Sequence, residues 1–147
     1  MVSVEFENAY AAHKRMLGEP NIGAYDAHRR YTREGIPEDY ATEALRRNIM
    51  PDAITSLHGE GVAIGEVDAF LEGQEALGIS TTADAAYNLI IIVHKAFRDE
   101  KVPSDYSQPL LRMGGGPFLI CDCWHNGIAL EYAQQMVAER IAERNAR

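Results

Sequence analysis

The sequence predicts an all-α protein: a single-domain, irregular bundle of six or seven helices spanning residues 1–147, with at most a short extended segment near residues 117–121. Three observations support this fold class. Hydrophobic residues recur at helical spacing through most of the chain, glycine and proline fall where helices end or begin, and strand signals are otherwise missing. The 147 residues, 46% of them hydrophobic and 24% charged, also match one ordinary globular domain.

Three helices are expected in the first third of the chain, over residues 3–17, about 22–34 and 37–49. Ser3 can accept hydrogen bonds from the first N–H groups of the first helix. The second helix is expected to stop at Gly35, and Pro37 suits the first position of the third. Met50 and Pro51 then break the apolar stripe of the third helix.

The remainder is expected to hold a turn at residues 54–57 and helices over about 63–77, 82–97 and 126–147. Thr81 and Asp84 have the spacing of a capping box for the helix that follows. Pro103 and Pro109 predict a loop. No internal repeat, low-complexity tract or long linker is detected, so the chain is interpreted as one domain.

The helix over residues 82–97 is the most apolar in the chain. Leu89, Ile90, Val93 and Phe97 lie at helical spacing along it. We therefore expect these four side chains to form the centre of the core.

The formal net charge of −8 argues against direct binding to nucleic acid or to an anionic membrane. Charge is also uneven, because no Lys or Arg occurs between Pro51 and His94. The middle of the chain should therefore present an acidic face.

Two features indicate a cytoplasmic protein from a reducing compartment. The two cysteines, Cys121 and Cys123, cannot form a framework of stabilising disulfides. The first ten residues contain two acids and no apolar run, unlike a signal peptide, and the apolar stretch 89–93 is too short to span a bilayer.

One candidate site consists of carboxylates on the helices over residues 63–77 and 82–97. Asp68, Glu72 and Glu75 cluster on one side of the first helix, and Asp84 opens the second. Convergent carboxylate oxygens are the ligands that Mg²⁺ or Mn²⁺ prefers. A solvated acidic face would produce the same pattern, because like charges at this spacing cost little when exposed.

A second candidate site is the segment 121–125, where Cys121, Cys123 and His125 offer thiolate and imidazole ligands for zinc. In an extended segment the two thiols would point the same way, whereas on a helix they would diverge. Burial of the cysteines in the core is the alternative interpretation. The triplet of glycines at 114–116 fits either a flexible or tight connection or an anion-binding loop.

Two helices carry apolar residues on more than one side. In the last helix, Leu130, Val137 and Ile141 lie opposite the face that holds Ile128, Tyr132 and Met136. If the latter face packs inward, the former is left as an exposed strip for a partner or a second copy. Ile91, flanked by Tyr87, is likewise expected outside the main apolar face of its helix.

The leading hypothesis is a non-enzymatic interaction or regulatory module without a cofactor, acting on a protein partner or on a second copy. It would use the last helix and the acidic face, and the acidic surface would favour basic partners. The alternative is a small enzyme that uses Mg²⁺ or Mn²⁺ on Asp68, Glu72, Glu75 and Asp84 to act on a phosphorylated small molecule.

Overall fold

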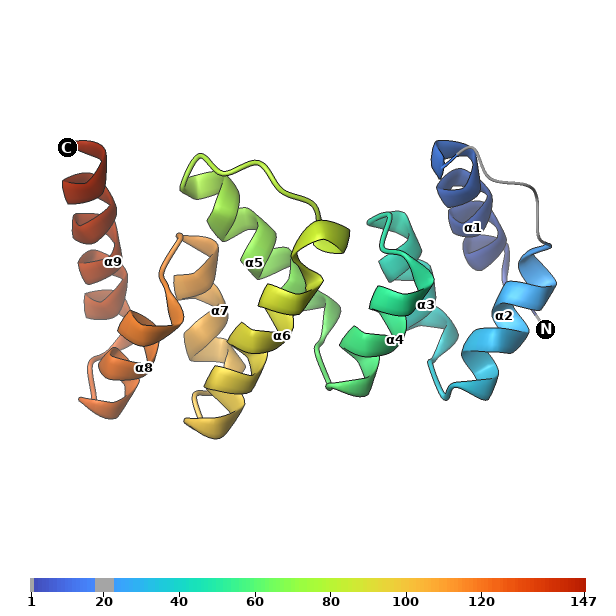
Figure 1. Ribbon diagram of the computed structural model, residues 1–147. Helices are drawn as coiled ribbons and strands as arrows, with labels where there is room; N and C mark the ends of the chain where they lie inside the picture. Colours follow the sequence, from blue (N-terminus) through green and yellow to red (C-terminus); the bar gives the residue numbers. More distant parts are fainter. Residues whose placement is uncertain (1, 18–22) are drawn as a thin grey trace. The chain divides into compact units, whose positions relative to one another are not determined.

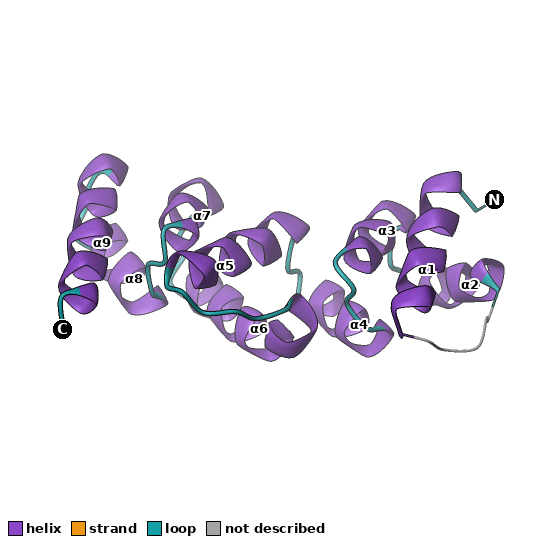
Figure 2. Ribbon diagram, turned by 90° about the horizontal axis from the view of Figure 1, so that it is seen from above, coloured by secondary structure: helices purple, strands orange, loops and turns teal. Residues whose placement is uncertain are grey.

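The structure, a computed structural model, describes residues 2–17 and 23–147. Within these residues every regular element is a helix and no strand occurs (Figures 1 and 2), so the prediction of an all-α protein is confirmed. The described helices exceed the six or seven expected. They are α1 (Val4–Leu17), α2 (Ala24–Arg33), α3 (Glu38–Arg46), α4 (Pro51–Gly59), α5 (Ile64–Ala76), α6 (Ala83–Asp99), α7 (Ser104–Arg112), α8 (Pro117–His125) and α9 (Leu130–Asn145).

Contacts between residues divide the chain into two compact units, Met1–Ile64 and Gly65–Arg147. The first unit contains α1 to α4, and the second contains α6 to α9 and nearly all of α5. The expectation of a single domain stays a prediction. None of the helices in the described residues is long and apolar enough to cross a membrane.

The additional helices begin at or directly after prolines. Pro51 and Pro117 stand in the first turns of α4 and α8, and Pro103 directly precedes α7. A proline in the first turn lacks only an N–H that has no partner inside the helix. The expected extended segment near residues 117–121 is therefore wrong, since these residues form the start of α8.

The N-terminus of α6 is capped one residue later than expected. The Thr82 hydroxyl, rather than that of Thr81, accepts a hydrogen bond from the backbone N–H of Ala85 at 3.1 Å. The cap of the first helix agrees with the sequence, because the Ser3 hydroxyl accepts from the N–H of Phe6 at 3.1 Å.

The C-termini of α2 to α8 share one local structure. After each helix comes a residue with positive φ, and the next residue donates its N–H to a carbonyl five residues earlier, as in the Schellman motif. At Gly35, for example, φ is 74° and Ile36 donates to Tyr31 O at 2.9 Å. The residue after the turn is buried in most cases, so each motif anchors a helix end to the core.

Each unit has its own aromatic and aliphatic core. In the first unit Phe6 packs edge-on against Tyr31, with ring centroids 6.2 Å apart. In the second, Ile90, Val93 and Phe97 are buried as expected. The prediction that Leu89 belongs to the centre of the core is wrong, because Leu89 is 49% exposed on the outer side of α6.

The two units repeat the same hairpin. Helices α3 and α4 recur as α7 and α8 with the same lengths, 66 residues later in the chain. The Tyr40 hydroxyl donates to Val62 O at 2.7 Å, and the Tyr106 hydroxyl donates to Ile128 O at the same distance. The expectation that the chain has no internal repeat is therefore wrong.

Candidate functional site

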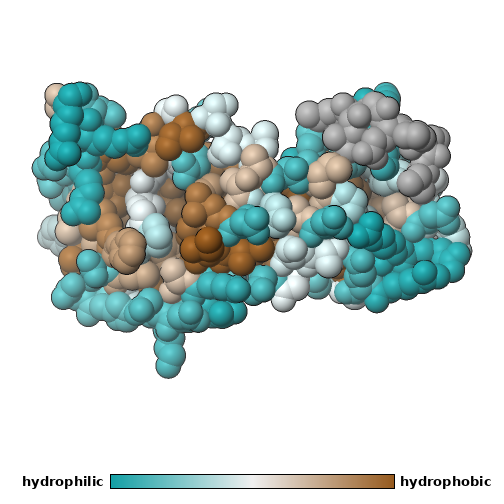
Figure 3. Space-filling view, viewed as in Figure 1, coloured by the Kyte–Doolittle hydropathy of each residue, from teal (hydrophilic) through white to brown (hydrophobic). Residues whose placement is uncertain are grey.

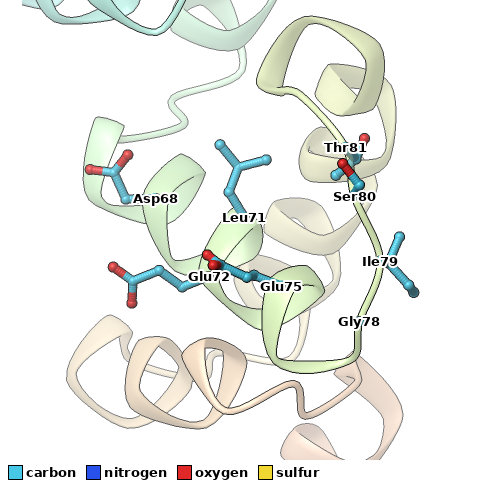
Figure 4. A pocket seen from close by; sticks show the side chains of 8 residues that line it. All are labelled: Asp68, Leu71, Glu72, Glu75, Gly78, Ile79, Ser80 and Thr81. Carbon is cyan, nitrogen blue, oxygen red and sulfur yellow. The ribbon is translucent and has the colours of Figure 1, made fainter.

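A groove runs along α5 and the following segment 77–82, within the second unit. Its volume is about 570 Å³. The residues that line it are Asp68, Leu71, Glu72, Glu75, Gly78, Ile79, Ser80 and Thr81. Figure 4 shows the three carboxylates on α5, with the segment 78–81 lying beside the helix.

The spacing of the three acids explains why they share one wall of this groove. Asp68, Glu72 and Glu75 follow one another by four and three residues, so they lie on adjoining turns of one helix side. Three of the four acids that were expected to bind a metal therefore line the same groove. Asp84 is not among the lining residues, because it belongs to the first turn of α6 beyond the segment 77–82.

Ile79 makes the groove partly apolar. It follows the left-handed turn at Gly78, and its N–H donates to Gln74 O at 2.9 Å. After the equivalent turns in the first unit, Ile36 and Ile49 are at most 4% exposed. Ile79 is instead 43% exposed, so the end of α5 leaves at the groove an isoleucine of the kind that the ends of α2 and α3 bury.

Basic groups approach the acidic side of α5 from neighbouring helices. Arg112 on α7 forms an ion pair with Glu72 at 2.7 Å, and His94 Nδ1 on α6 lies 2.6 Å from Glu66 Oε2. Among the described residues, no group of three or more His, Cys, Asp or Glu side chains is arranged to hold a metal ion.

The thiols and imidazole of α8 do not converge. Because α8 is helical, Cys121 is half-buried while Cys123 is buried, with its sulfur 3.9 Å from that of Met136. His125 Nε2 instead lies 2.7 Å from Glu100 Oε2. Burial raises the pKa of both thiols, which favours their neutral form over the thiolate.

The last helix packs against the core through the side that contains Val137, which was expected to be exposed to solvent. Val137 is 1% exposed and Ala133 is fully buried, whereas Tyr132 is 64% and Met136 38% exposed. The expected strip of Leu130, Val137 and Ile141 is therefore corrected: Val137 belongs to the core, and the other two are half-buried.

Ile91 and Tyr87 on α6 are also half-buried. The large apolar residues of this helix that are exposed are Leu89 at 49% and Ile92 at 61%. The glycine triplet is a tight connection: Gly114 ends α7, Gly115 is buried, and Gly116 precedes the first residue of α8.

The second unit therefore presents an acidic and partly apolar groove along α5 and exposed apolar side chains on α6, α8 and α9. No family model matches the chain, and no match was found among curated proteins or solved structures.

Proposed function

We propose that the protein is a non-enzymatic interaction module that binds a cationic, partly apolar segment of another protein in the groove along α5. One observation carries this proposal: the carboxylates of Asp68 and Glu75 share the groove with the side chains of Leu71 and Ile79, and none of the described lining residues is Lys or Arg. The third carboxylate, that of Glu72, already pairs with Arg112 of α7.

The groove suits long cationic side chains. Lys and Arg can place their charged ends near carboxylates while their methylene stems cover apolar surface. Leu71 and the exposed Ile79 provide that surface beside Glu75. The overall charge of −8 adds long-range attraction, which speeds association with basic partners and weakens as salt is added.

The test uses a short synthetic peptide in which arginine alternates with leucine. Amide NMR spectra of the labelled full chain should shift at residues 68–81 as peptide is added. The double variant Asp68→Asn/Glu75→Gln should weaken binding by about threefold to tenfold, because exposed ion pairs each contribute about 0.2–1 kcal/mol. Glu143→Gln, which removes an exposed acid from α9, is the matched control and should bind as the wild type does.

Two results would overturn the proposal. One is a peptide that binds the double variant as tightly as the wild type. The other is a set of shifts confined to residues outside the groove. A companion peptide with glutamate in place of arginine should cause no shifts, and equal binding of both peptides would exclude charge as the basis of recognition.

A second candidate function is divalent-metal chemistry on a phosphorylated small molecule. It rests on Asp68, Glu72 and Glu75 lining one groove, although among the described residues these acids do not form a metal-binding group and Glu72 pairs with Arg112. A bound Mg²⁺ or Mn²⁺ would stabilise the native state by mass action. Millimolar ion should then raise the melting temperature of the wild type but not that of Asp68→Asn/Glu75→Gln. An unchanged melting temperature of the wild type would eliminate this function.

A further inference from the structure

The internal repeat allows surface positions of α2 to α4 to be compared with their counterparts in the second half of α6, in α7 and in α8. The sequence Pro37-Glu38-Asp39-Tyr40 recurs as Pro103-Ser104-Asp105-Tyr106, and Pro51 recurs as Pro117 at the same offset of 66 residues. His28 and Tyr31 of α2 correspond to His94 and Phe97 of α6 in the same way. An offset shared by sequence, helix bounds and hydrogen bonds indicates a tandem duplication.

The outer surface of α2 and α4 is polar in the first unit. Asp26 is exposed on α2. Arg30, one turn later, forms an ion pair across to Asp52 of α4 at 3.3 Å. The Asp52 side chain is 94% exposed, so this pair lies on the surface.

The counterpart surface of α6 and α8 is apolar. Ile92 replaces Asp26 and is 61% exposed, and Phe118 replaces Asp52 and is 89% exposed. Ala96 stands in place of Arg30, and Leu89 occupies the position of Gly23. Figure 3 shows hydrophobic side chains gathered over the middle of α6. We call Leu89, Ile92, Ala96 and Phe118 the α6–α8 surface.

Folding does not explain this apolar surface. The first unit carries aspartates and an arginine at the counterpart positions on α2 and α4, so these positions tolerate polar side chains. Phe118 at 89% exposure contributes little to the core of its own unit. Exposed apolar side chains grouped in this way usually mark a contact with another molecule.

We propose that the α6–α8 surface binds an amphipathic helix of a partner protein, with apolar residues on one side and Lys or Arg beside them. Leu89, Ile92 and Ala96 follow the spacing of a single helical stripe, which a partner helix can pack along. Asp122, four residues after Phe118, flanks the surface with an exposed carboxylate. Asp99, seven residues after Ile92, is exposed too and pairs with Arg98 at 3.3 Å.

The charges favour a basic partner over a second copy of the chain. Two copies of a protein with a net charge of −8 would repel each other. A direct pairing of two α6–α8 surfaces would also bring their flanking carboxylates together. A cationic partner helix would instead be attracted by the net negative charge and would neutralise Asp122.

The test places in the second unit the polar residues that the first unit has at the counterpart positions. The double variant Ile92→Asp/Phe118→Asp carries the aspartates that α2 and α4 already have, so it should keep the helical content and the melting transition of the wild type. Its matched control is Val4→Asp, which removes an apolar side chain that is 66% exposed on α1. The probe is a synthetic amphipathic helix with leucine on one face and lysine on the other, and binding is measured by fluorescence anisotropy on the full chain.

The double variant should bind the lysine-rich helix at least about tenfold more weakly than the wild type or Val4→Asp. Unchanged affinity of the double variant would overturn the proposal, as would no binding to the wild type. Binding that is lost in Asp68→Asn/Glu75→Gln but kept in the double variant would overturn it too, while supporting the groove along α5. Light scattering could instead show that the wild type is a dimer and that Ile92→Asp/Phe118→Asp is a monomer. That result would overturn the proposal, because a second copy of the chain would then cover the α6–α8 surface.

Discussion

Gly73 provides the sharpest test of how α5 packs against α7. It is buried in the last turns of α5, and its backbone approaches the carbonyl of Leu111. A Cβ added at Gly73 would overlap the carbonyl oxygen of Leu111 and would lie 3.2 Å from the Leu111 carbonyl carbon. Because these neighbours are backbone atoms, no side-chain rotation can relieve the overlap, and α5 and α7 must move apart.

Two opposing effects set the result of Gly73→Ala. Alanine favours a helix interior over glycine by about 1 kcal/mol. Forcing packed elements apart costs about 1–3 kcal/mol and sometimes more. The overlap with backbone places the cost near or above the upper end of that range, so the net loss should be about 2 kcal/mol. In a chain of this length, such a loss lowers the melting temperature by about 4–8 °C.

Thermal unfolding followed by circular dichroism measures this loss, with Gly59→Ala as the control. Gly59 is also helical, at the end of α4, but an added Cβ would meet nothing within 4 Å. Gly59→Ala should therefore leave the melting temperature unchanged or raise it slightly. A melting temperature of Gly73→Ala at or above that of the wild type would show that α5 and α7 are not in the close contact described here.

The remaining predictions concern the cores and the repeat. Phe97→Ala should lower the free energy of unfolding by about 3–5 kcal/mol, measured by urea denaturation, because it removes a buried aromatic side chain. Tyr40→Phe and Tyr106→Phe should each cost about 1 kcal/mol in the same assay, and the double variant should cost the sum, since each hydroxyl bonds within its own unit; unequal losses would argue against equivalent roles. Val137→Glu should unfold α9 from the core, whereas Tyr132→Glu should leave the melting temperature nearly unchanged; similar melting for both would refute the orientation of α9.

The sequence contained a signal for the repeat that helical periodicity alone does not detect. The pairs Asp39-Tyr40 and Asp105-Tyr106, each two residues after a proline, are the clearest part of it. Pro51 follows an apolar stripe and predicts a break there, although it begins a helix of the same length as the one that Pro117 begins. A proline is compatible with both roles, so comparing the chain with itself at a fixed offset was needed to decide between them.

The candidate site was predictable only in part. The spacing of Asp68, Glu72 and Glu75 placed them on one side of α5, and the structure adds the segment 77–82 beside them. The exposure of Ile79 had no sequence signal, because the same turn buries Ile36 elsewhere in the chain. Whether a residue after a helix end is buried depends on which helices pack against that end.

The sequence by itself determined the helical fold class, the caps such as Ser3, and the helix ends at glycines such as Gly35, because these depend on interactions among residues close in the chain. Only the tertiary structure decided which side of a helix with two apolar sides is buried. In α9 Val137 is buried and Tyr132 is exposed, and in α6 Ile90 is buried and Ile92 is exposed. Periodicity shows which residues share a side of a helix, but the neighbouring helices that pack against the helix determine which side is buried.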